Sequence, residues 1–175
     1  TLATLHNLSC LYFDLKKFSK ACELQNIVYN ETKKIMGVHH PKTLTALHNL
    51  ACTYSDLGEN NIPLELHKAV YNALKEKLGE NHPDTLKALS DLARSYSDLG
   101  NYNKALEIEI KVYNALKEKL GENYPLTLSA LNDIASYYSD LGDYSKALDL
   151  HNIVYNAFKE ILGEDHPDTL RSLAN

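Results

Sequence analysis

The sequence contains few cysteines, no long apolar run and no excess of positive charge, and each absence argues against a class of protein. Its three cysteines, Cys10, Cys22 and Cys52, form no CxxC pair and no even-numbered set, which indicates a reducing compartment. No run of about 18 apolar residues is available to span a membrane, and the N-terminal residues lack the charged, apolar and small-residue regions of a signal peptide. We therefore expect a cytoplasmic protein without a membrane partner.

The charge pattern argues against nucleic acid as a partner. The formal net charge is −5, and basic residues are mixed with acidic ones every few positions, so no basic stripe is available to neutralise a phosphate backbone. An apolar fraction of 44 % and a charged fraction of 23 % are ordinary for a soluble globular protein. The composition thus predicts an ordered, soluble domain.

What the sequence does contain is an internal repeat. The eleven residues YNALKEKLGEN begin at Tyr71 and again at Tyr113, 42 residues later, and looser copies begin at Tyr29 and Tyr155. A repeat of this length is typical of stacked helical units. We expect residues 1–175 to form a single repeat domain, with units at 1–42, 43–84, 85–126 and 127–168 and the start of a fifth unit at 169–175.

Each unit is predicted to contain two helices, A and B. In the third unit, two series of apolar residues recur at intervals of three and four, which favours an A helix followed by a B helix of about 19 residues. The series are Leu86, Leu89, Leu92, Ala93, Tyr96 and Leu99 for helix A, and Tyr102, Ala105, Ile108, Val112, Tyr113, Leu116 and Leu120 for helix B. Gly100 and Gly121 are predicted to end these helices, whereas Lys16 stands at the position of Gly100 in the first unit.

Two residues are expected to modify the helix starts. The side chain of His82, just before Pro83, is predicted to cap the next A helix in preference to binding a ligand. Pro63 falls inside the B helix of the second unit, and a proline within a helix costs about 3 kcal/mol unless it lies in the first turn. That helix is therefore predicted to start late, near Asn61.

The residues at the helix crossings resemble the tetratricopeptide signature. They are Leu89, Leu92, Ala93, Tyr96, Gly100, Tyr102 and Ala105 in the third unit, and Leu131, Ile134, Ala135, Tyr138, Gly142, Tyr144 and Ala147 in the fourth. The unit length and the linkers LGENHPDTL and LGEDHPDTL are similar to the repeats of kinesin light chains and their relatives. This resemblance implies an all-α fold, a right-handed α-solenoid of helix-turn-helix tetratricopeptide-like repeats.

The resemblance also implies a function and a site. Repeats of this type carry an Asn-Asn-Leu-Ala tetrad in helix A, and the A helices line a concave groove that holds an extended peptide. We therefore expect a non-catalytic protein–protein interaction scaffold that binds a peptide or partner segment in this groove. The candidate groove residues are His6, Asn7, Cys10, Phe13, Thr45, His48, Asn49, Cys52, Lys87, Ser90, Asp91, Arg94, Ser129, Asn132, Asp133 and Ser136.

The tetrads suggest a ligand preference. No unit keeps both asparagines, but Asn7, Asn49 and Asn132 are each able to grip a peptide backbone, because an amide offers both a donor and an acceptor. Kinesin light chains are known for cargo peptides of acidic and aromatic character, whereas Asp91 and Asp133 here place carboxylates in the tetrads. We predict a mixed or basic peptide there, anchored by an apolar residue near Phe13 and Cys52.

Enzymatic and metal functions are not expected. The sequence contains no Gly-rich phosphate loop, HExxH helix or GxSxG elbow, so no catalytic residue and no cofactor is assigned. His6 and His48 are predicted to approach each other on neighbouring A helices, but two imidazoles without a third ligand make a weak metal site. Cys10 and Cys52 are interpreted as small packed side chains, with a redox or metal role as the alternative.

Self-assembly is the competing function. The sequence begins and ends within the repeat pattern, which suggests end helices without polar capping faces. The alternative to peptide binding is therefore a spacer module that self-associates end to end within a larger protein.

Overall fold

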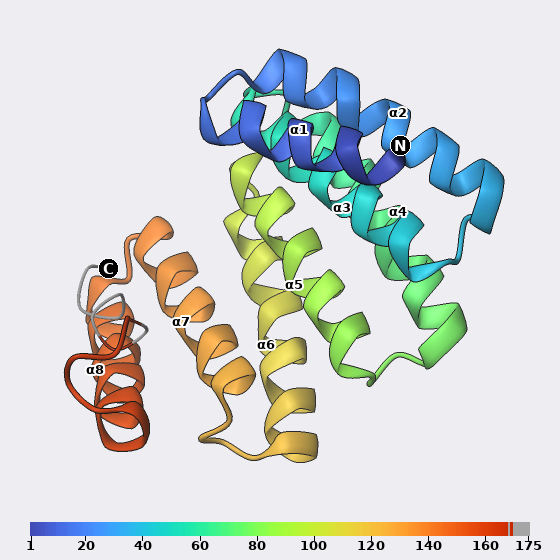
Figure 1. The fold of residues 1–175 in the computed structure, drawn as a ribbon. Coiled ribbons are helices and arrows are strands. Elements are labelled where there is room, and N and C mark those ends of the chain that lie inside the picture. Colours follow the sequence, from blue (N-terminus) through green and yellow to red (C-terminus); the bar gives the residue numbers. More distant parts are fainter. Residues whose placement is uncertain (168, 170–175) are drawn as a thin grey trace. The chain divides into compact units, whose positions relative to one another are not determined.

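The structure is a computed structural model that describes residues 1–167 and 169, and every element in this described part is an α-helix (Figure 1). The A helices are α1 (Leu2–Asp14), α3 (Pro41–Asp56), α5 (Pro83–Asp98) and α7 (Pro125–Asp140). The B helices are α2 (Phe18–Met36), α4 (Asn61–Leu78), α6 (Tyr102–Leu120) and α8 (Tyr144–Leu162). The predicted all-α solenoid of helical repeats is confirmed, and helices α2, α6 and α8 have the expected length of 19 residues.

Proline and histidine together start the A helices. Proline is the first residue of α3, α5 and α7, where its fixed φ suits the helix and its missing N–H group leaves no intrahelical bond unmade. The Nδ1 atom of His82 accepts a hydrogen bond from the backbone N–H of Asp84 at 3.2 Å, and His40 accepts one from Lys42 at the same distance. The predicted capping role of His82 is confirmed, and Tyr124, at the equivalent position, makes no side-chain cap.

Proline also sets the start of α4. This helix begins at Asn61, as predicted, so that Pro63 lies in its first turn and is buried. The equivalent residue of α6, Ala105, donates its backbone N–H to the carbonyl of Asn101 at 3.1 Å. A proline cannot make that bond, and the later start of α4 removes the need for it.

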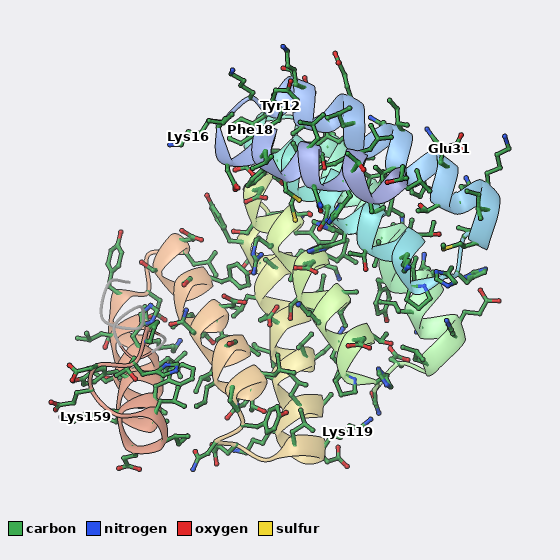
Figure 2. All side chains as sticks on the ribbon, viewed as in Figure 1. Tyr12, Lys16, Phe18, Glu31, Lys119 and Lys159 are labelled. Carbon is green, nitrogen blue, oxygen red and sulfur yellow. The ribbon has the colours of Figure 1, made fainter. Side chains whose placement is uncertain are left out.

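The turn from α1 to α2 is built on a residue other than glycine. Lys16 has a φ of 54°, in the left-handed region where a side chain is strained, and glycine occupies this place in the other A-to-B turns. The backbone N–H of Lys17 still donates to the carbonyl of Tyr12 at 2.8 Å, and the equivalent bond from Glu59 to Tyr54 measures 3.0 Å. Figure 2 shows the Lys16 side chain projecting away from the helices beside Phe18. The turn therefore keeps its hydrogen bonds despite the strained residue.

The chain divides into two compact units. The first, Thr1–Leu99, contains α1 to α5, and the second begins at Gly100 and contains α6 to α8. The third predicted repeat is therefore divided, with its A helix in the first unit and its B helix in the second. Within each unit, consecutive helices run back alongside one another (Figure 1).

Each unit has its own apolar core. In the first unit, Leu47 of α3, Val70 of α4 and Ala88 of α5 form a buried cluster. In the second, Leu128 and Leu131 of α7 pack against Val154 and Phe158 of α8. All of these residues except Ala88 occupy positions of the predicted apolar series, which places one apolar stripe of each helix on its neighbour.

The repeat boundaries and the handedness of the solenoid stay predictions. Each predicted unit from 1–42 to 127–168 contains one A helix and one B helix. Of the predicted fifth unit, 169–175, the described residues include Thr169 alone, and the rest lies outside them. Among the helices described here, none is both long and apolar enough to span a bilayer.

Candidate functional site

Four of the predicted site residues line one hollow in the first unit. Cys10 and Phe13 of α1 and Asn49 and Cys52 of α3 surround a space of about 200 Å³, together with Asp14, Gln25 and Thr53. The Phe13 ring is held by an edge-to-face contact with Phe18, with 5.4 Å between the ring centroids. We call this space the α1–α3 hollow. Phe13 and Cys52 thus line the same hollow, and the binding of an apolar ligand residue there stays a prediction.

A second, larger cavity lies between α3, α4 and α5 and has a volume of about 560 Å³. Thr45 and His48 of α3 and Lys87 and Asp91 of α5 line it, and all four were predicted site residues. The rest of the lining is Pro41, Leu44, Val70, Leu74, Lys77, Leu78, His82, Asp84 and Ala88. We call this space the α3–α5 cavity. The α4 side of its lining is apolar except for Lys77, and the whole lining carries both signs of charge, from two lysines and two aspartates.

Asp91 is turned inward and bound by neighbouring side chains. It is 9 % exposed, its Oδ2 atom lies 3.2 Å from Nδ1 of His48, and its Oδ1 atom lies 3.8 Å from a guanidinium nitrogen of Arg94. Arg94 itself is exposed on α5. The carboxylate therefore contributes little unbalanced negative charge to the surface, which the tetrad pattern alone did not predict.

A cluster of histidine and cysteine lies beside this pair. Nε2 of His48 is 3.7 Å from Sγ of Cys52, one helical turn along α3. The imidazole of His67, on α4, faces that of His48 with 5.5 Å between the ring centroids. One ligand atom from each of His48, Cys52 and His67 lies within 4.8 Å of the other two. His67 was not among the predicted site residues.

The surroundings of this cluster shift the pKa values of two of its residues, His67 and Cys52. Burial lowers the pKa of His67 from 6.5 to about 4, with a smaller opposing contribution from Asp91. Burial, followed by the negative charge of Asp91, raises the pKa of the Cys52 thiol. At neutral pH the cluster therefore contains a neutral imidazole at His67 and a protonated thiol at Cys52.

The remaining first-unit site residues are half-buried or exposed. His6 lies 3.9 Å from Cys10 through its Nε2 atom and lines a separate, largely apolar hollow of about 330 Å³ with Leu2, Ala3 and Thr45. Asn7 is exposed on α1, and Ser90 is half-buried on α5.

In the second unit, the site residues all lie on α7. Oδ1 of Asn132 accepts a hydrogen bond from Nδ1 of His151 on α8 at 3.1 Å, and Ser136 donates to the backbone carbonyl of Asn132 at 3.1 Å. Asp133 is half-buried and Ser129 is exposed. Burial lowers the pKa of His151, so a neutral ring donates through Nδ1 to the amide oxygen. A single groove along the A helices of all four repeats stays a prediction.

The comparisons with known proteins agree with the repeat pattern. A family model described as tetratricopeptide repeat matches residues 64–118 and 126–175, and another of the same description matches residues 1–42 and 43–84. The fold is similar to the nearly identical TPR-like repeats of a Podosopora anserina protein assigned as a kinesin light chain. The identity there is 27 % and the TM-score 0.78, over 98 % of this chain and 81 % of that chain. No match is found among curated proteins.

Two more distant structures share the fold alone. BtubC (BKLC) from P. vanneervenii is 16 % identical with a TM-score of 0.77, over 95 % of this chain and 66 % of that chain. A Rap protein complexed with Competence and Sporulation Factor is 14 % identical with a TM-score of 0.75, over 97 % of this chain and 45 % of that chain. Tetratricopeptide repeats generally mediate protein interactions and are generally non-catalytic. The chain belongs to the tetratricopeptide repeat family, and its repeats are of the kinesin light chain-like type.

Proposed function

We propose that the chain is a non-catalytic interaction scaffold that binds an extended peptide or partner segment on the surface of its A helices. The observation that carries this proposal is the α1–α3 hollow, where residues of two consecutive A helices surround one space of about 200 Å³. Such a hollow suits one apolar side chain of a ligand. The amide of Asn49 at its edge is able to donate to and accept from the ligand backbone.

The fold class supports the same proposal. Tetratricopeptide repeats generally mediate protein interactions, and the similar Rap protein was solved in complex with Competence and Sporulation Factor. At 14 % identity the Rap likeness concerns the fold alone, so the support for an interaction function comes from the tetratricopeptide repeat family.

The charges around the α3–α5 cavity favour a ligand of mixed charge. Lys77 and Lys87 line it with Asp84 and Asp91, so the formal charges of the lining balance. The carboxylate of Asp91 is in addition held by His48 and Arg94. A peptide with both acidic and basic residues flanking an apolar anchor therefore fits better than a strongly acidic or strongly basic one.

Fluorescence polarisation with a panel of labelled peptides tests this function. The panel keeps one apolar anchor and varies the sign and number of flanking charges. We expect the mixed peptides to bind best, and Cys10→Glu, which places a charge at the α1–α3 hollow, to weaken binding at least tenfold, about 1.4 kcal/mol. Asn49→Ala is expected to weaken the same peptides, because it removes the amide donor and acceptor.

The matched control is Glu65→Ala, an exposed substitution on the B helix α4. It leaves binding unchanged if the ligand lies on the A helices. If Cys10→Glu and Asn49→Ala leave binding unchanged while Glu65→Ala abolishes it, the ligand does not lie on the A helices. A folded chain that binds no member of the panel contradicts peptide binding.

Self-association is a second candidate function, favoured by the outer side of α1. Leu8 and Leu11 on this helix and Leu15 directly after it are 39 %, 58 % and 64 % exposed. Apolar side chains gathered on one helix are typical of contact surfaces. Light scattering over a concentration series discriminates the two candidates, since a chain that stays monomeric at high concentration excludes self-association.

A further inference from the structure

We propose that His48, Cys52 and His67 form a binding site for a transition-metal ion of the zinc class, within the second repeat. Two residues come from consecutive turns of α3 and the third from α4, so an ion would link the A and B helices of one repeat. One ligand atom from each residue already lies within 4.8 Å of one from each of the other two. A tetrahedral ion with bonds of about 2.0 to 2.3 Å needs ligand spacings of about 3.3 to 3.8 Å. The Nε2 to Sγ distance between His48 and Cys52, 3.7 Å, is already in that range.

His67 is oriented as a metal-binding histidine would be. It is 5 % exposed, and its Nδ1 atom lies 2.7 Å from Oγ of Ser95. The Ser95 hydroxyl donates its own proton to the backbone carbonyl of Asp91 at 3.3 Å, so its oxygen accepts from the imidazole. The proton of the neutral ring is thereby placed on Nδ1. The other nitrogen, Nε2, is buried with no hydrogen-bond partner and keeps its lone pair for a ligand.

His48 is prepared in the same way. Its Nδ1 atom lies 3.2 Å from the carboxylate of Asp91, which fixes the proton on Nδ1 and leaves the lone pair of Nε2 on the side of Cys52. A carboxylate behind a histidine is the usual outer partner of a zinc-bound imidazole, since it orients the ring and increases its basicity. The positive charge of the nearby Arg94 guanidinium disfavours a bound cation. The guanidinium lies 3.8 Å from the Asp91 carboxylate, however, and the negative charge of Asp91 offsets it.

The ligand set indicates which ions fit. Two imidazoles and one thiolate favour Zn²⁺ and other borderline ions over Ca²⁺ or Mg²⁺, which prefer oxygen. Binding replaces the S–H bond of Cys52 by a bond from sulfur to the ion, and the proton passes to solvent. Three protein ligands leave a fourth position for water.

The other repeats supply natural comparisons. His6 and Cys10 repeat the His48 and Cys52 pair one period earlier, with 3.9 Å between Nε2 and Sγ, but the residue equivalent to His67 there is Gln25. In the fourth repeat the equivalent of His67 is His151, whereas Asn132 and Ser136 replace the other two ligands. Among the described residues, the combination of three ligands arises in the second repeat alone.

Titration of the untagged, reduced chain of 175 residues tests the proposal. Co²⁺ serves as a spectroscopic probe, because a thiolate bound to it gives a charge-transfer band. Zn²⁺ is then titrated against a chromophoric chelator. We expect one equivalent of either ion per chain and full displacement of the Co²⁺ band by Zn²⁺. Cys52→Ser and His67→Gln are each expected to abolish the band and to weaken Zn²⁺ binding by about a hundredfold or more.

Outer-partner, control and gain-of-site variants sharpen the assignment. Ser95→Ala, which removes the acceptor behind His67, is expected to weaken Zn²⁺ binding by about ten- to a hundredfold. Cys10→Ser and Cys22→Ser leave the band unchanged, since neither residue is a ligand. Gln25→Leu also leaves it unchanged, because leucine offers no ligand atom, whereas Gln25→His completes a second set with His6 and Cys10 and is expected to bind a second equivalent.

Circular dichroism establishes that each variant is folded before it is titrated. The proposal is overturned if the folded, reduced chain shows no thiolate band at excess Co²⁺. It is equally overturned if a band persists in both Cys52→Ser and His67→Gln, because the ion would then be held by other side chains.

Discussion

Glu107 of α6 lies between two lysines one turn away on either side. Its carboxylate is 2.6 Å from Nζ of Lys111 and 2.9 Å from Nζ of Lys104. Hydrogen bonds from Lys111 and then Lys104 lower the pKa of Glu107 from 4.5 to about 2. Because the folded-state pKa is lower than the unfolded one, the interaction stabilises the chain above about pH 4.5 and is lost as the pH falls towards 2.

We predict that Lys111→Ala raises the pKa of Glu107 towards its ordinary value, since it removes the largest cause of the shift. A pH titration of the Glu107 side-chain carboxyl by NMR measures this. Lys117→Ala is the control, because Lys117 pairs with Glu122 at 2.7 Å and not with Glu107. An unchanged pKa in Lys111→Ala would mean that the ion pair does not persist in solution. All three charged groups are solvent-exposed, so added salt is expected to weaken the effect.

His67 is the residue that the sequence predicted least well. His48 and Cys52 stand four residues apart on one predicted helix, so their proximity follows from the helical period. His67 reaches them only through the packing of α4 on α3. The repeat alignment does contain a signal that could have identified His67. One B-helix position is polar in every unit, where the residues are Gln25, His67, Glu109 and His151. Such a recurrent polar position on an apolar stripe marks a contact with the A helix.

Among the elements, the A-to-B turns differ mainly at Lys16. Gly58 and Gly142 adopt φ values of 79° and 83° at the equivalent positions, and Lys16 adopts 54°. A side chain in this left-handed region costs about 1 to 2 kcal/mol. The 42-residue period predicted these turns and identified Lys16 as the exception. The structure shows that the first turn has the same left-handed backbone as the others, although Lys16 is strained in it.

Lys16→Gly is therefore predicted to stabilise the chain by about 1 kcal/mol, with a rise in Tm of about 2 to 4 °C. Thermal unfolding followed by circular dichroism measures it. Gly58→Ala is the converse test and is expected to destabilise by a similar amount. A Cβ atom added there meets no atom within 4 Å, so any loss reflects the backbone alone. A destabilising Lys16→Gly would show that the lysine side chain stabilises the turn more than its strain costs.

The helices themselves were the most predictable elements. Apolar residues at intervals of three and four, proline at the helix starts and glycine at the ends all act within a few residues of sequence, so periodicity is sufficient to identify them. The pairing of His48 with Asp91 was not predictable in this way. These residues are on α3 and α5, and their contact depends on how two A helices pack.

For the molecule as a whole, the division into two units predicts how it responds to damage. Leu128, 1 % exposed, lies in the core of the second unit with Val154 and Phe158. Leu128→Ala is predicted to cost about 2 to 5 kcal/mol, because it removes buried apolar contacts and leaves a cavity. Hydrogen exchange followed by mass spectrometry is expected to show the largest loss of protection in α7 and α8.

Leu47→Ala, in the core of the first unit, is the matched variant and should direct the loss of protection to α3 and α4. Equal loss of protection throughout the chain in both variants would contradict two separable units and indicate a single cooperative one. The sequence predicted one continuous repeat domain, because a 42-residue period marks every unit alike and carries no sign of a weaker junction.

The helix pairs that pack most extensively are all consecutive in sequence. Closing the short loops between them carries a small entropic cost, so a helical hairpin is able to form without waiting for distant segments. During synthesis, α1 and α2 are therefore able to pair as soon as both have left the ribosome, and α3, α4 and α5 are then each able to pack on the helix before them. The repeat architecture thus lets the N-terminal helices begin to assemble while the C-terminal ones are still being translated.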